Sequence, residues 1–160
     1  MAYQRLQVSE GLAVIPSNTV PIPDPATLAT SGTTAGTAVT NKLVNTGVDF
    51  TAMGIQLNAI VYNTTDSTSA FVTGVDSATT LSLSDDIFAA SENYTIYNAA
   101  TKAAILYIGV AGDLVVEMAS QRDSGATPTL TFKAAPAGFM PTLVTKVGAS
   151  TAATDIIALW

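Results

Sequence analysis

The sequence predicts an all-β protein: an antiparallel β-sandwich or barrel, jelly-roll-like, with an extended N-terminal arm and an inserted small β module. Short runs rich in Val, Ile, Thr, Tyr and Phe recur at close intervals, with turn residues between them. Several runs alternate polar and apolar residues at period two, and no window sustains a helical period. Short strands at regular spacing are typical of sandwiches and barrels.

Residues 1–26 are predicted to form an extended arm that packs on the C-terminal module or on a neighbouring subunit. Four prolines, Pro16, Pro21, Pro23 and Pro25, exclude a helix or a central strand. Such a segment is too short to bury its apolar side chains within itself, so it is expected to dock elsewhere. The candidate interface residues are Tyr3, Leu6, Val8, Val14, Ile15, Val20 and Ile22.

Residues 27–98 are predicted to form the inserted small β module. Its first part, Thr27 to Thr40, fits a surface linker or a weak edge strand. A hairpin is predicted from residues 59–62 and 70–75 around the turn-rich run 63–68, and a second tight connection leads into residues 80–84. The alternating run 93–97 closes the module.

Residues 99–160 are predicted to form a C-terminal β-sandwich module. A hairpin is expected from residues 105–108 and 114–118, and Gly109 to Gly112 is interpreted as its turn, because neither a helix nor a lysine follows as a phosphate loop requires. Further strands are expected at 130–132, 142–147 and 155–160, with a turn at 135–138. Trp160 is either a core plug or a subunit contact, and the apolar run before it favours the core.

Composition excludes several partners. Only 11% of the 160 residues are charged and the net charge is −6, with six scattered Lys and Arg, so nucleic acid is not a predicted partner. The most apolar stretch, residues 103–112, is far shorter than the roughly 20 residues that span a membrane, so no membrane partner is predicted. The first ten residues show no basic region followed by an apolar one, and no secretory signal is expected.

Catalysis is not expected. The chain has no His and no Cys, which removes Ser-His triads, thiolate nucleophiles and imidazole metal ligands. Asp85, Asp86 and Glu92 are candidate carboxylates for glycoside hydrolysis, but they lie in a turn region, and a solvated acidic loop is the favoured interpretation. The protein is therefore predicted not to be an enzyme.

Calcium binding is also not expected. Asp66, Asp76, Asp85 and Asp86 lie in loops of one module, and clustered oxygens are what calcium prefers. Their spacing does not match a dedicated calcium loop, and aspartate in hairpin turns is the simpler interpretation. No metal and no cofactor is predicted.

The last third of the chain carries an ordered set of short motifs: Leu106–Val116, Leu130–Phe132, Pro136–Gly138, Pro141, Val147 and Ile156–Trp160. This set resembles a module of capsid-attached proteins of phages and gene transfer agents, including bases of head spikes. The resemblance covers about residues 99–160 and the arm, where Asn18–Pro23 takes the place of the family's N-terminal strand.

The middle of the chain carries a second set of motifs: Lys42–Phe50, Ile60–Asp66, Val75–Ser77, Leu81–Phe88 and Tyr94–Tyr97. This set is similar to a small β unit of phage tail, fibre and decoration proteins. Together the two resemblances imply a phage capsid decoration (cement) protein, made in the host cytoplasm and located on the outer capsid surface of the virion. The implied partners are the major capsid protein and further copies of the chain, as a homotrimer.

Two alternatives stay open. The same modules fit a vertex head-spike base or a tail or neck component. A host-glycan-binding module is the second alternative, whose sign would be exposed aromatic platforms. Tyr62, Phe71, Tyr94 and Tyr97 lie in predicted strands, where core packing is the simpler account.

Overall fold

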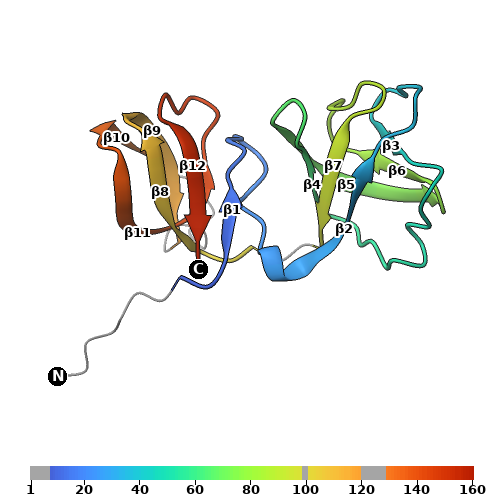
Figure 1. The fold of residues 1–160 in the computed structure, drawn as a ribbon, viewed down its shortest axis with the longest axis horizontal. Coiled ribbons are helices and arrows are strands. Elements are labelled where there is room, and N and C mark those ends of the chain that lie inside the picture. Colours follow the sequence, from blue (N-terminus) through green and yellow to red (C-terminus); the bar gives the residue numbers. More distant parts are fainter. Residues whose placement is uncertain (1–7, 99–100, 120–128) are drawn as a thin grey trace. The chain divides into compact units, whose positions relative to one another are not determined.

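The computed structural model of the protein describes residues 8–98, 101–119 and 129–160 (Figure 1). It is all-β, with 52% strand and 3% helix in two antiparallel sheets, one of them curled into a half-barrel, and this confirms the predicted class. One short 3-10 helix, Pro25–Thr27, is capped by Asp24, whose side chain accepts from the amide of Ala26. The strands are β1 (Gly11–Ala13), β2 (Leu28–Thr33), β3 (Lys42–Val44), β4 (Ile60–Asn63), β5 (Thr68–Ser77), β6 (Thr80–Leu83), β7 (Asn93–Tyr97), β8 (Ala104–Val110), β9 (Gly112–Met118), β10 (Thr129–Ala135), β11 (Gly138–Val147) and β12 (Thr154–Leu159).

The chain divides into two compact units. The terminal unit consists of residues 1–18 and 102–160, and the middle unit consists of residues 19–101. The middle unit is thus inserted in the sequence between β1 and β8. The division differs from the expected ranges at the arm, because residues 19–26 belong with the middle unit, where Pro23 forms an isolated bridge with Thr101.

The sheet of the terminal unit has the order β1-β12-β8-β11-β9-β10. The arm contributes the edge strand β1, which pairs antiparallel with β12 from Gly11 opposite Leu159 to Ala13 opposite Ile157. Further backbone hydrogen bonds run from the amide of Ser9 to the carbonyl of Trp160 (2.6 Å) and from the amide of Ser17 to that of Val147 (2.8 Å). Residues 9–17 of the arm therefore pack on the C-terminal segment of their own chain.

The predicted hairpin between β8 and β9 is wrong. Only Ala111 separates the two strands, but each of them pairs with β11 instead of with the other. The strand β11 has ten residues, enough for its first part to pair with β8 and its last part with β9, with Val144 opposite both Ala104 and Met118. The turn predicted at residues 135–138 is confirmed between β10 and β11, and Gly138 there has φ +128°, a conformation that only glycine adopts readily.

The core of the terminal unit is aliphatic. Alternate residues of β8, β9 and β12 are buried, which is the period-two pattern of strands that cover a core on one face. Trp160 does not plug this core: it is half-buried, and its indole Nε1 donates to the carbonyl of Lys102 at 3.3 Å. The buried hydrophobic residues of this unit are Ile15, Ala104, Leu106, Ile108, Leu114, Val116, Ala135, Val144, Val147, Ala153, Ile156 and Ala158.

The sheet of the middle unit has the order β2-β7-β4-β5-β6-β3. Both predicted tight connections are confirmed, since β4 pairs with β5 and β5 with β6. The ten-residue β5 carries two register shifts and passes from one partner to the other, so it links the two halves of the sheet. Within the stretch 27–40, residues 28–33 form an edge strand, which is one of the two expected outcomes.

Aromatic side chains fill the middle unit. Tyr94, 1% exposed, lies with its ring centroid 6.2 Å from that of Phe50 and 6.4 Å from that of Phe88, and Tyr62 and Tyr97 form a second edge-to-face pair at 5.8 Å. These rings bury large apolar areas, and such pairs add about 0.5–1.5 kcal/mol beyond burial. Tyr62, Tyr94 and Tyr97 therefore lie in the core, as expected from their strands, whereas Phe71 is half-buried.

In the part of the chain that the structure describes, no helix is long and apolar enough to cross a membrane.

Candidate functional site

A row of side chains crosses four neighbouring strands on the outer face of the terminal sheet. Ala13 on β1 is directly opposite Ile157 on β12, Ile157 is opposite Tyr107 on β8, and Tyr107 is opposite Phe139 on β11. Their neighbours in each of β8 and β12, such as Leu106 and Ile156, point into the core. We call Ala13, Ile157, Tyr107 and Phe139 the aromatic row.

The two rings of the aromatic row contact each other while facing solvent. Phe139 is 65% exposed and Tyr107 37% exposed, and their ring centroids lie 5.4 Å apart at an interplanar angle of 68°. Ile157 beside them is also exposed, and the next cross-strand pair, Leu159 with Ile105, is half-buried. A contiguous exposed apolar area of this kind is characteristic of interaction sites on soluble proteins.

The second feature is a mostly apolar pocket between β10 and β11, of about 300 Å³. Ile108 and Met140 come from the core side of the sheet, and Phe139 of the aromatic row forms part of the wall. Lys133 at the wall is held by Asp113, with Nζ 2.6 Å from Oδ2, and the amide of Ala134 donates to Oδ1 of the same carboxylate. These bonds lower the pKa of Asp113, the contact with Lys133 most strongly.

The candidate interface residues of the arm lie in different settings. Ile15, Val20 and Ile22 are at most 9% exposed, so their burial removes them from any partner surface in this conformation. Val14 is half-buried and Val8 is exposed. Tyr3 and Leu6 fall outside the described residues.

The acidic residues considered for catalysis or calcium each have a local structural partner. Asp86 accepts from the amide of Asn41 at 3.0 Å, and Asp85 accepts from the hydroxyl of Ser84 at 2.8 Å. Within residues 8–98, 101–119 and 129–160, no three acidic side chains come together as a metal site would need. The structure therefore does not assemble these carboxylates into one site.

Glu92 has a structural role, because it fixes the side chain of a buried asparagine. The amide of fully buried Asn63 donates to Oε2 of Glu92 at 2.8 Å, and the backbone amide of Ala89 donates to the same oxygen at 2.7 Å. The Ala89 amide is the main cause that lowers the pKa of Glu92, whereas a hydrogen bond with Glu92 raises the pKa of neighbouring Asp66. Neither carboxylate lines the pocket described above, and Glu92 connects the hairpin β4–β5 to the loop between β6 and β7.

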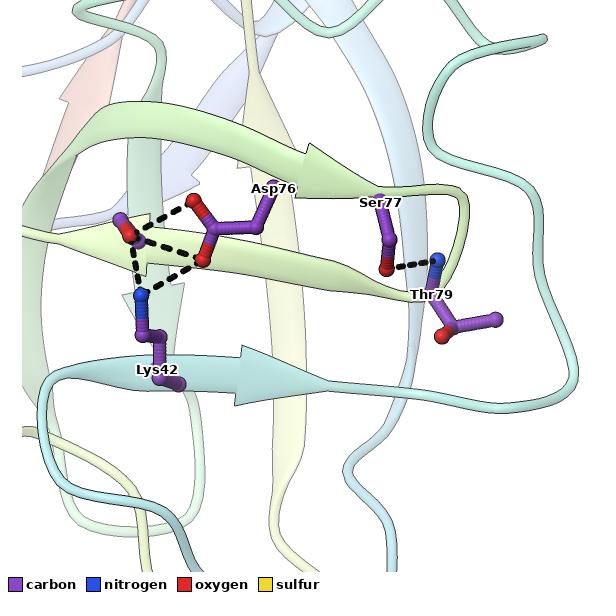
Figure 2. A network of polar contacts seen from close by, with 5 residues as sticks. Lys42, Asp76, Ser77 and Thr79 are labelled. Atoms are coloured by element: carbon purple, nitrogen blue, oxygen red, sulfur yellow. Dashed lines mark hydrogen bonds and ion pairs between the residues drawn. The ribbon is translucent and has the colours of Figure 1, made fainter.

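A polar network ties β3, β5 and β6 together on the middle unit (Figure 2). Nζ of Lys42 donates to Oδ2 of Asp76 at 2.6 Å and to Oγ of Ser82 at 2.5 Å, while Ser82 donates to Asp76. Donation from Lys42, and then from Ser82, lowers the pKa of Asp76. Lys42 donates hydrogen bonds to both neighbours, so its amine is not available as a general base that would activate Ser82. The network therefore has a structural role: it links the three strands.

Comparison of the chain with protein-family models, with curated proteins and with solved structures found no match. The fold and the site therefore rest on the geometry alone. They define an all-β protein whose most distinctive surface is an exposed apolar row, together with an adjoining apolar pocket.

The aromatic row was missed in the sequence. Tyr107 lies in the apolar run 105–108, a composition that predicts burial. Phe139 directly follows a predicted turn. Period-two alternation offered one signal, because Tyr107 stands between Leu106 and Ile108 and must point to the opposite face. The pairing of residues 107, 139 and 157 depends on strand order, and no local pattern indicates it.

Proposed function

We propose that the protein is a structural component of a phage particle: a capsid decoration protein that binds the outer surface of the assembled head and stabilises it by bridging capsomers. The observation that carries the proposal is the aromatic row. Its two rings are turned outward although the core of the same unit is aliphatic, so this unit presents Tyr107 and Phe139 to a partner.

The energetics suit a protein that works in many copies. Burial of apolar surface contributes roughly 25 cal/mol per Å², and aromatic side chains are the most effective anchors of interfaces. One row of four residues supplies a modest affinity by itself. On a repeating shell, many contacts of this size add through effective concentration.

The finer assignment rests on the resemblances. The ordered motifs of the last third support attachment to a capsid, and the similarity of the middle block to a recurring surface unit supports decoration of a shell. The absence of His and Cys and the low charge fit a role in adhesion better than a role in chemistry. The major capsid protein is the proposed partner, with the homotrimer as the proposed oligomer.

Co-sedimentation with shells tests this proposal. We expect Phe139→Asp to abolish co-sedimentation with heads of the parent phage, because it places a charge in the centre of the buried contact. Leu57→Asp is the matched control, since Leu57 is 60% exposed on the middle unit and lies outside the aromatic row. Equal co-sedimentation of wild type and Phe139→Asp would contradict the proposal.

A vertex head-spike base or a tail or neck component is the alternative within the same class. Copy number per particle separates the two, since decoration requires hundreds of copies and a vertex or tail a few tens or fewer. Quantitative mass spectrometry of purified particles measures it.

Binding of host glycans is a second candidate function, because the ring pair of Tyr107 and Phe139 is exposed. Sugars stack on flat aromatic surfaces, whereas Tyr107 and Phe139 meet at 68° and form a corner, which favours the decoration role. A glycan array compares wild type with Phe139→Ala, and binding lost in the variant would favour the glycan module.

A further inference from the structure

The core of the terminal unit is open along the edge strand β10. Leu130 and Phe132 are directly opposite Val116 and Leu114, so they point to the same face of the sheet as these two fully buried residues. Yet Leu130 is 43% exposed and Phe132 only half-buried. Core-facing side chains stay exposed here because β10 has only β9 as a partner among the described strands.

The pocket continues the same opening. Ile108, Phe132 and Met140 line it from the core side, and its volume of about 300 Å³ is at the lower end for ligand pockets, a size that suits one or two side chains. An edge strand beside a pocket is the arrangement by which sheets accept an extra strand: main-chain hydrogen bonds give affinity, and alternate side chains enter the pocket. The geometry thus fits an extended peptide with apolar residues at every second position.

We propose that this edge accepts residues 1–7 of a second copy of the chain as an added strand. This segment lies outside the described residues, contains neither Pro nor Gly, and carries the apolar residues Tyr3 and Leu6. In a strand, Leu6 and Val8 share one face, and Leu6 is the side chain assigned to the opening beside Leu130. β10 is regular from Thr129 to Phe132, and a register shift follows. An added strand that pairs with this regular part would need about four residues.

Sheet order favours exchange between copies. The segment continues directly into β1, which is one edge of the sheet, whereas β10 is the other edge. A donor at one edge and an acceptor at the other make a head-to-tail interface, which closes into a ring when the rotation permits.

The inference deepens the proposed function by assigning how the decoration protein associates with itself, and it is tested without shells. Because the natural chain has no cysteine, Leu6→Cys combined with Leu130→Cys reports the contact cleanly. On oxidation we expect disulfide-linked dimers and larger species on a non-reducing gel. Leu6→Cys with Leu57→Cys is the matched control and is expected to give only the background of each single variant.

A mixing experiment gives a second readout by light scattering. We expect the wild type at a multiple of 16.3 kDa, and both the chain lacking residues 1–7 and Leu130→Asp as monomers. The truncated chain keeps the acceptor and Leu130→Asp keeps the donor, so their mixture is expected to form a 1:1 heterodimer. Circular dichroism checks that each variant is folded.

Three outcomes would overturn the inference: a wild type that stays monomeric at high concentration, a truncated chain with the wild-type mass, or a Leu6–Leu130 disulfide that forms only within one chain. If the truncated chain associates normally but fails to bind shells, the segment docks on the capsid protein instead, which refutes strand exchange and leaves the proposed function standing. If association is as expected but wild type does not bind shells, only the proposed function fails.

Discussion

The two units of the molecule use their aromatic side chains in opposite ways. In the middle unit, Phe50, Tyr62, Phe88, Tyr94 and Tyr97 are buried, and only Phe71 is half-buried. In the described part of the terminal unit no aromatic residue is buried: Tyr107 and Phe139 are exposed, and Phe132 and Trp160 are half-buried. The middle unit thus uses most of its rings to fill its own core, whereas the terminal unit leaves two rings, Tyr107 and Phe139, on its surface.

A second contrast concerns the sheet edges. The edge strand β2 of the middle unit has six residues with an exposed Leu28, and the edge strand β3 has only three residues with a buried Leu43 between half-buried neighbours. The edge strand β10 has seven residues and turns two core-facing side chains toward solvent. Apolar side chains at an unpaired edge invite pairing with another chain. Because β2 and β10 differ in length by one residue, the contrast lies in the two core-facing side chains of β10, and it supports the terminal unit as the part proposed to bind partners.

The largest expected effect tests the aromatic contrast directly. Phe50→Ala removes a ring that is 0% exposed and should lower the free energy of unfolding by about 3–5 kcal/mol. Phe139→Ala, at 65% exposure, should lower it by about 1 kcal/mol or less, mainly through the lost ring pair. Urea denaturation followed by circular dichroism measures both. Similar losses for the two variants would break the comparison.

A slightly smaller effect is expected from the buried ion pair of the terminal unit. Lys146 on β11 lies directly opposite Glu117 on β9, with Nζ 2.8 Å from Oε2, and both side chains are at most 10% exposed. Lys146→Met leaves the carboxylate buried without its counter-charge and should lower the free energy of unfolding by about 3 kcal/mol.

The double variant Lys146→Met with Glu117→Met is the control for that prediction. Replacement of both charges removes the unpaired group, so most of the lost stability should return. A double variant as unstable as the single one would show that packing, and not charge, explains the loss. Recovery in the double variant would show that the terminal unit tolerates this ion pair without depending on it, whereas the middle unit depends on its buried rings.

The smallest expected effect concerns acid stability. The pKa of Asp76 is lowered in the folded state, so its ion pair with Lys42 stabilises the fold above the unfolded pKa of about 3.8 and is lost as the pH falls through the lower folded value. Because both side chains are about one-third exposed, the contribution is within about 1 kcal/mol.

Unfolding measured at pH 7 and pH 3 checks this expectation. Asp76→Asn should lower the stability at pH 7 slightly and should make the loss between the two pH values smaller than in wild type. Asp113→Asn is the equivalent change in the terminal unit, where contact with Lys133 lowers the pKa of Asp113 in the same direction. An unchanged or steeper pH dependence in Asp76→Asn would refute the assigned cause.

Local patterns predicted the parts of the fold that local interactions determine. The hairpin around residues 63–68 and the connection before Thr80 are marked by turn residues between alternating runs, and both form. The pair β8 and β9 carries the same kind of signal at Gly112 and Asp113, yet β11 inserts between them. That outcome depends on a strand some thirty residues away along the chain, which no turn pattern indicates.

The candidate site was less predictable than the fold. The arm was expected to carry the interface. Ile15 is buried where the arm joins the sheet of its own chain through β1, and Val20 and Ile22 are buried in the stretch that belongs with the middle unit. The aromatic row combines residues 13, 107, 139 and 157 through three strand pairings. Alternation tells which face each side chain takes, but only the order of the strands tells which side chains become neighbours.

The bridge between Pro23 and Thr101 has a consequence for how the chain can be altered. It brings Pro23, near the start of the middle unit, and Thr101, its last residue, to the separation of paired strands, about 5 Å between Cα atoms. A short linker in place of residues 24–100 would therefore connect the same two points of the backbone. Residues 24–100 are therefore a place where a foreign domain with adjacent termini can be inserted.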